Sequence, residues 1–191
     1  MSGTAFLPAG ELAARIRRGE TTAVVAVGEA LERIARLQAP LNAYVTVCGD
    51  DALARAAAVD AAIARGEAVG PLAGVPYSVK DIINTKGVRT AWGSKLMADN
   101  VPEADGVAVA RMNAAGAILL GKTTTPEFAF KLLTDSPLTG ITRNPWNPEL
   151  TPGGSSGGSP WRWPPAWGRC RWPPTPAPRR ACRPPAAASS A

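Results

Sequence analysis

Lys80 is the first residue of this sequence whose type and setting suggest chemistry. It ends residues 74–80, a mostly apolar run that is typical of a buried strand. Burial removes water from a lysine amine and favours its neutral form, which is a base. An ion pair with the adjacent Asp81 is the alternative, and it would make Lys80 a structural residue. The sequence contains no histidine, so Ser-His-Asp triads, Cys-His pairs and histidine-bound metal ions are excluded.

Residues 151–159 form the second candidate, a segment of glycines and serines. Such a composition is also typical of a flexible linker. The preceding residues 142–148 are turn formers around Trp146, and we expect this tryptophan to anchor the segment on a fixed scaffold. Glycines then permit close backbone approaches that place hydroxyl groups against a neighbouring strand. The central residues of the segment are Gly153, Gly154, Ser155, Ser156, Gly157 and Gly158.

Residues 116–123 match the pattern GxxxxGK[ST] of phosphate-binding loops, with Lys122 as the lysine. That loop requires a strand before its first glycine and a helix after its lysine. Here the intervening residues 117–120 are themselves an apolar strand, and Pro126 follows closely. Amides that pair within a sheet cannot surround a phosphate, so the sequence predicts a strand and a turn instead of a nucleotide site.

The elements that must position these residues follow from the hydrophobic periodicity. Helix and strand patterns alternate along residues 1–159, which predicts an α/β sheet. Two amphipathic helices open the chain, and Thr21 and Thr22 are candidate caps of the second. The expected elements are helices through Leu12 and Ile16 and over residues 24–37, 51–65 and 107–115, and strands over residues 43–47, 74–83 and 117–120.

The net charge of +6 would suggest a nucleic acid or an acidic membrane as partner if it were spread over the chain. Residues 1–159 contain 15 Lys+Arg and 15 Asp+Glu, whereas residues 160–191 contain six Arg and no acidic residue. The same 32 residues hold nine of the 19 prolines and four of the six tryptophans, without Leu, Ile or Val. Because they cannot build an aliphatic core, residues 160–191 are expected to form an irregular Pro/Arg/Trp-rich tail.

Cysteine spacing and the N-terminus indicate the compartment. Cys48, Cys170 and Cys182 show no CxxC spacing, and the N-terminus lacks the basic start and apolar run of a signal peptide. No apolar run reaches the roughly 18 residues that span a bilayer. We therefore expect a cytoplasmic protein with no membrane partner, no cofactor and no metal ion.

Three segments, in this order and spacing, resemble the amidase signature family of amide hydrolases. They are residues 71–87 (PLAGVPYSVKDIINTKG), 116–130 (GAILLGKTTTPEFAF) and 142–159 (TRNPWNPELTPGGSSGGS). The resemblance covers residues 5–159. It implies an α/β fold in which helices flank a mixed β-sheet, and of which this chain holds the N-terminal portion. Residues 5–159 are thus expected to form a truncated amidase signature domain.

The resemblance also implies a Ser-cisSer-Lys triad. Lys80 matches its lysine, Ser155 matches a serine held on a cis peptide bond, and a nucleophilic serine follows in a DxGxSxRxP segment. As a neutral base, Lys80 would draw a proton through the Ser155 hydroxyl from the nucleophile, which attacks the amide carbonyl. The proton would return to the leaving amine. Ser156 is expected beside this pair, and the four glycines of residues 153–158 are expected to form a loop at the substrate.

The nucleophile of this triad is missing from the sequence. Arg179 lies 24 residues beyond Ser155, where the resemblance requires a serine, and residues 160–188 contain none. Residues 159–184, translated with the frame shifted by one base, can encode DAGASARVP, whose serine codon spans Pro178 and Arg179. We therefore interpret the tail as the product of a frameshift or a sequencing error, and the 191-residue chain as catalytically incompetent.

Two alternatives remain open. The family includes the A subunit of a tRNA-dependent amidotransferase, although residues 122–136 look more like a stand-alone amidase. A real, divergent tail would instead bind single-stranded nucleic acid through arginine charge and tryptophan stacking. A shifted frame explains the composition, the charge and the lost motif together, so the expected partner of the intact protein is a small-molecule amide and not a nucleic acid. Neither the particular amide nor the oligomeric state follows from the sequence.

Overall fold

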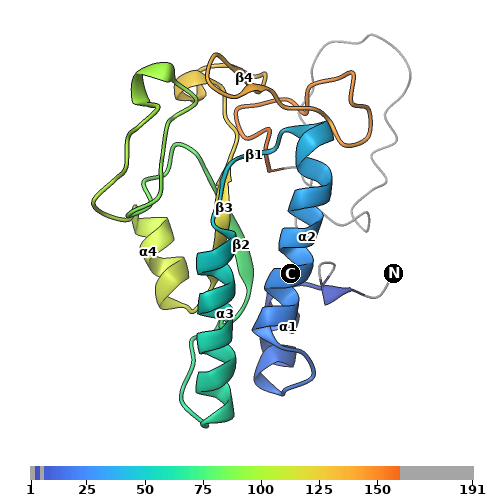
Figure 1. Cartoon of the computed structure of the whole chain (residues 1–191), viewed down its shortest axis with the longest axis vertical. Helices are drawn as coiled ribbons and strands as arrows, with labels where there is room; N and C mark the ends of the chain where they lie inside the picture. Colours follow the sequence, from blue (N-terminus) through green and yellow to red (C-terminus); the bar gives the residue numbers. More distant parts are fainter. Residues whose placement is uncertain (1–2, 5–6, 160–191) are drawn as a thin grey trace, which may run out of the picture.

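The central element is a three-stranded sheet. The computed structural model describes residues 3–4 and 7–159 (Figure 1). Strands β1 (Tyr44–Val47), β3 (Ile118–Thr123) and β2 (Pro76–Lys80) lie side by side in that order. Strand β2 runs parallel to β3, whereas β1 runs antiparallel to it. The sheet is therefore mixed, as predicted.

Within the described residues, four α-helices flank this sheet. They are α1 (Ala9–Arg17), α2 (Ala23–Leu41), α3 (Gly49–Ala64) and α4 (Val107–Ala114), each close to its predicted range. Helices α2 and α4 lie on opposite sides of the sheet (Figure 1). The connections also contain short elements. They include the 3₁₀ turns η2 (Lys95–Met97) and η3 (Glu127–Ala129), and a hairpin of β4 (Asp135–Ser136) and β5 (Gly140–Ile141).

Side chains of the strands alternate between two apolar clusters. Ile118 and Leu120 pack with apolar residues of α1, α2 and α3. Leu119 packs with Tyr77, Val79 and residues of α4 on the other face. Strand side chains alternate between the two faces of a sheet with a period of two. Tyr77 and Val79 face the second cluster, so Ser78 and Lys80 face the first.

Thr22 caps α2, as predicted. Its Oγ1 accepts a hydrogen bond from Val25 N at 3.1 Å. The Asp60 carboxylate of α3 accepts from Ala23 N at 2.7 Å and from Val24 N at 3.0 Å. A negative charge at a helix N-terminus satisfies free amides and complements the helix dipole. These contacts join the N-terminus of α2 to α3.

Two predicted strand bounds were wrong. Strand β2 ends at Lys80, and the residues up to Ile83 form a turn in which Ile83 N donates to Lys80 O at 3.0 Å. Strand β3 continues through Thr123 instead of ending at residue 120. A lysine ends the apolar pattern, but Lys122 can remain in the buried strand because its ammonium group finds acceptors inside the protein.

Some predicted features lie outside the described residues. They are Cys170, Cys182 and the expected irregular tail, all of which belong to residues 160–191.

Cys48 is a free, half-buried thiol. Among residues 3–4 and 7–159, no helix has the length and apolar character needed to cross a membrane. The cytoplasmic location stays a prediction.

We predict that Ile118→Ala lowers the free energy of unfolding by about 2–5 kcal/mol, because Ile118 is 1% exposed and its removal leaves a cavity. Urea denaturation followed by circular dichroism measures this change. Leu96→Ala is the control, since Leu96 is 86% exposed, and it should change stability by no more than about 0.5 kcal/mol. Equal effects of the two substitutions would contradict the described core.

Candidate active site

The site is built on one hydrogen bond between distant segments. Lys80, at the end of β2, donates from Nζ to Ser155 Oγ at 2.7 Å, across a separation of 75 residues. Lys80 is half-buried. Burial lowers the pKa of Lys80. The lysine and the serine that the sequence singled out are therefore within reach of direct proton transfer.

Asp81 is not the partner of Lys80. The Asp81 carboxylate is fully buried, and its Oδ2 accepts from Ala91 N at 3.1 Å. Within the described part of the chain, Lys80 makes no ion pair. The structural alternative for Lys80, an ion pair with its neighbour, is therefore wrong.

Thr134 holds the Gly/Ser segment in place. Its Oγ1 donates to Gly153 O at 2.7 Å and accepts from Gly157 N at 3.0 Å. These two bonds bracket Ser155, which follows a cis peptide bond with Gly154. The segment is thus fixed on both sides of the serine and is not a flexible linker.

The glycines after Ser155 are needed for a close approach to the sheet. A Cβ on Gly157 would lie 2.0 Å from Thr134 Oγ1, and one on Gly158 would lie 2.4 Å from Ala43 O. Both distances are far below van der Waals contact. The backbone therefore passes against Thr134 at Gly157, and against the ends of β1 and β3 at Gly158, only because these two positions lack a side chain.

The predicted anchor, Trp146, is wrong. Its side chain is 80% exposed, so it cannot hold the glycine segment. The turn around it is held by its asparagines, because Trp146 N donates to Asn144 Oδ1 and Glu149 N donates to Asn147 Oδ1. The anchoring falls instead to threonines, chiefly to Thr134, whose hydroxyl bonds the glycine segment directly.

Ser156 is adjacent to the pair but exposed to solvent. Its carbonyl oxygen accepts from Ser159 N at 3.0 Å. A contact of the Ser156 hydroxyl with Lys80 or Ser155 stays a prediction. Arg179, at the position where the family resemblance implies a nucleophile, lies outside the described residues.

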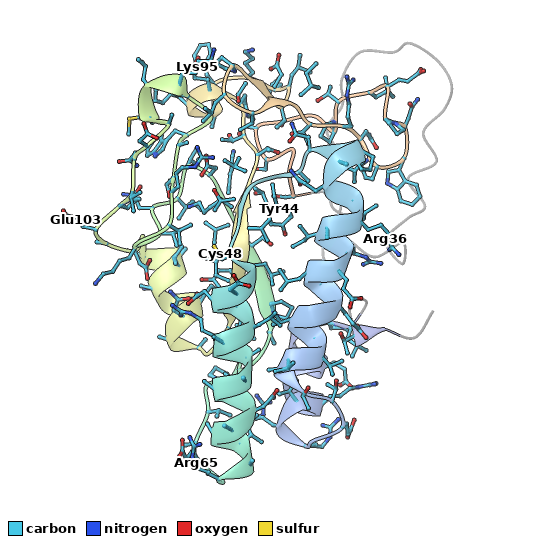
Figure 2. All side chains as sticks on the ribbon, in the orientation of Figure 1. Arg36, Tyr44, Cys48, Arg65, Lys95 and Glu103 are labelled. Carbon is cyan, nitrogen blue, oxygen red and sulfur yellow. The ribbon has the colours of Figure 1, made fainter. Side chains whose placement is uncertain are left out.

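Three hydroxyl-bearing residues on the Lys80 face of the sheet were missed: Tyr44, Ser78 and Thr123. Tyr44 OH and Ser78 Oγ share a hydrogen bond of 2.5 Å, and Tyr44 lies in the interior beside the central strands (Figure 2). Thr123, paired in register with Lys80, has a buried Oγ1 with no partner among the described residues. Alternation along 76–80 already places Ser78 on the face of Lys80, and this signal could have identified it.

The phosphate-loop pattern has no phosphate site. Lys122 is fully buried, and its Nζ donates to Thr85 Oγ1 at 2.9 Å, to Thr90 Oγ1 at 3.0 Å and to Ile83 O. An ammonium group has three protons, so none remains for a ligand. The interpretation as a buried strand is confirmed.

Comparison with known proteins shows the family to which this chain belongs. The sequence model of the family described as Amidase matches residues 26–160. The chain belongs to the amidase family. The A subunit of the glutamyl-tRNA(Gln) amidotransferase of Geobacter metallireducens is 46% identical over 149 residues, which is 78% of this chain and 30% of that protein.

Solved amidase structures share the fold. The chain is 36% identical to the peptide amidase of Stenotrophomonas maltophilia, with a TM-score of 0.74, over 79% of this chain and 32% of the other. It is 31% identical to a bacterial aryl acylamidase of the amidase signature family, with a TM-score of 0.76, over 80% and 32%. The described residues thus have the amidase signature fold, and the chain spans about a third of the length of these relatives.

We predict that Thr134→Val loosens the segment around Ser155. The isosteric valine keeps the packing but leaves Gly153 O and Gly157 N without their bonds, which costs about 1–3 kcal/mol of stability. Amide hydrogen exchange measures the effect directly, and the Gly157 amide should exchange faster.

Ser156→Ala is the matched control for this substitution, because Ser156 is exposed on the same segment. It should leave both exchange and stability unchanged. If Thr134→Val left exchange of the Gly157 amide unaltered, the segment would be held by other contacts.

Proposed function

We propose that the described residues are the part of an amide hydrolase that carries its proton relay. In the intact protein, Lys80 is the base, Ser155 transmits the proton, and the product pair is a carboxylate with an amine or ammonia. The observation that carries this proposal is the 2.7 Å hydrogen bond between Lys80 Nζ and Ser155 Oγ. Family membership supports it independently.

The lowered pKa of Lys80 supports the direction of proton flow. Burial disfavours the ammonium form, so a larger share of the amine is neutral near pH 7 than for an exposed lysine. The neutral amine accepts the Ser155 proton, while Ser155 Oγ accepts the proton of an attacking serine. On collapse of the tetrahedral intermediate, the same path returns the proton to the leaving nitrogen. No histidine is needed.

The relay is one part of a larger domain in this proposal. The chain covers only 27–34% of the solved structures that it resembles. Among the described residues, seven of the 14 exposed large apolar side chains fall in the segment 128–150, which leads into the Gly/Ser loop. They include Phe130, 92% exposed, and Trp146, 80% exposed. In this proposal, the rest of the domain covers this segment.

The 191-residue chain is catalytically incompetent under this proposal. A relay base and a relay hydroxyl do not replace the atom that attacks the carbonyl, and Arg179 offers no such atom. The donors of an oxyanion hole would come from the same segment as the nucleophile. A one-base frameshift or sequencing error after residue 158 accounts for the loss of both.

The A subunit of a tRNA-dependent amidotransferase is the second candidate. Curated relatives of this chain, at 44–46% identity, are the A subunits of glutamyl-tRNA(Gln) amidotransferases. The solved neighbours include a peptide amidase and an aryl acylamidase. The two candidates share the relay and differ in the source of the substrate. Hydrolysis of simple amides by the restored protein alone favours the amidase, and activity only with further subunits and glutamyl-tRNA favours the amidotransferase.

The test compares the 191-residue chain with a version whose reading frame is restored from residue 159 onward. We expect the restored protein to hydrolyse simple aliphatic or aryl amides and the 191-residue chain to show no turnover. In the restored protein, Lys80→Met and Ser155→Ala should each lower kcat by about 10³-fold or more, as removal of a triad member does.

Lys86→Met is the control, because Lys86 is an exposed lysine six residues from Lys80. It should leave kcat unchanged. Turnover by the 191-residue chain that is abolished by Lys80→Met would show that a different residue is the nucleophile. Unchanged kcat in the restored Lys80→Met variant would refute the relay.

A further inference from the structure

Thr134, which holds the Ser155 segment, lies opposite a second buried threonine in the hairpin. Asp135 of β4 pairs with Ile141 of β5. The ladder continues by one pair, because Thr142 N donates to Thr134 O at 2.9 Å. Each of the two threonines is 1% exposed. Their hydroxyls are therefore buried polar groups that must find their partners inside the protein.

The Thr142 hydroxyl joins the hairpin to the central sheet. Its Oγ1 donates to Asn42 O at 2.8 Å and lies 2.7 Å from Thr124 Oγ1. Asn42 lies between α2 and β1, and Thr124 directly follows β3. A hydroxyl has one proton, and that of Thr142 goes to Asn42 O, so Thr124 is the donor in the contact between the two threonines. The other acceptor near Thr124 Oγ1, Ala43 O, is farther away at 3.3 Å.

Thr124 lies next to the row of the sheet that contains Lys80. The residue before it, Thr123, pairs in register with Lys80, and these two residues end the parallel strands β3 and β2. The hairpin lies at this end of the sheet (Figure 1). It therefore contacts β3 one residue beyond the row that holds the proposed base.

The two threonines of the hairpin thus connect the two halves of the relay. Thr142 bonds the end of the sheet beside Lys80. Thr134 bonds the Gly/Ser segment on both sides of Ser155. A more direct bond joins Gly158 N to the carbonyl oxygen of the residue after β3, but its length is 3.4 Å. Ordinary N–H···O bonds measure about 2.7–3.2 Å, so the short bonds between sheet and segment run through the hairpin.

Other bonds hold the same hairpin to the end of α2. Asn42 Nδ2 donates to Thr139 O at 2.6 Å and to Ile141 O at 3.2 Å. Arg143 N donates to the last carbonyl oxygen of α2 at 2.8 Å. These bonds lead to the helix, whereas the Thr142 hydroxyl also reaches the residue after β3. The two kinds of attachment can be separated by substitution.

We propose that Thr142 is a positioning residue: its hydroxyl fixes the hairpin, and with it Thr134 and Ser155, against the end of β3. The distance between the Lys80 amine and the Ser155 hydroxyl then depends on a hydrogen bond that involves neither group. The importance of this bond for catalysis rests on the proposed function. The arrangement itself is a property of the 191-residue chain and can be measured there.

The measurement is the ε-carbon resonance of Lys80, by NMR of the 191-residue chain after ¹³C labelling of lysine. Ser155→Ala gives the reference shift for a lost Lys80 bond. Thr142→Val keeps the shape of the side chain and removes its hydroxyl, and the Lys80 resonance should move by about half of the reference shift or more. Thr142→Ser keeps the hydroxyl and should leave the resonance in place. A role of Thr142 in stability alone would not move it.

Asn42→Gly is the matched control. It removes the two side-chain bonds to the hairpin, while glycine still permits the φ of 49° at this position. It should leave the Lys80 resonance where it is. An unmoved resonance in a folded Thr142→Val variant overturns the proposal, and so does an equal shift in Asn42→Gly.

Thr124→Val keeps the proposal falsifiable if Thr142→Val does not fold. It removes the other hydroxyl of the same contact, so it should move the Lys80 resonance by a similar amount. A resonance that stays in place in this variant overturns the proposal.

Activity separates this inference from the proposed function. In the restored protein, Thr142→Val should lower kcat about 10²-fold, as a misplacement of about 1 Å does. The resonances need no turnover. A restored protein without activity, in which the Lys80 resonance still shifts as expected, counts against the proposed function only. An active restored protein in which Thr142→Val changes neither kcat nor the resonance counts against the role of Thr142 only.

Discussion

The contact between the Lys80 amine and the Ser155 hydroxyl sets the demands that the rest of the structure meets. A hydrogen bond of 2.7 Å across 75 residues requires that both ends be held to within a fraction of an ångström. Strand β2 holds Lys80 through its parallel pairing with β3. Thr134 holds the Ser155 segment by bonds on both of its sides. The Lys80 amine must also lie away from carboxylates. Alternation along the strand places Asp81 on the opposite face of the sheet.

Buried polar groups therefore serve the site from both faces of the same sheet. On the face where Lys80 lies, Tyr44 OH and Ser78 Oγ share a hydrogen bond. On the other, Lys122 donates to Ile83 O, Thr85 Oγ1 and Thr90 Oγ1 of the segment that follows β2, and Asp81 accepts from Ala91 N. Each group would be costly in an apolar core by itself. Their hydrogen bonds constrain the end of β2 and the segment that follows it from both faces.

The local elements could be predicted from the sequence, and the contact between Lys80 and Ser155 from the family resemblance. Helical spacing located α1 and α2, and the N-cap at Thr22 follows from residue type. Bounds failed where tertiary contacts decided them: β3 extends through Lys122 because its acceptors come from residues 83–90, remote in sequence. Trp146 was wrong as an anchor because residue type does not reveal exposure. Thr134 was missed because its bonds to the glycine loop carry no sequence pattern.

A proton relay of this kind requires that the pKa of Lys80 be lowered and that its amine form a hydrogen bond with Ser155. The most direct measurement is the pKa of Lys80 in the 191-residue chain. We expect this pKa to lie below the ordinary value of a lysine because Lys80 is partly buried, and we expect Ser155→Ala to shift the Lys80 ε-carbon resonance while leaving those of the exposed Lys86 and Lys95 in place. A Lys80 pKa at the ordinary lysine value, with a resonance unaffected by Ser155→Ala, would contradict the relay.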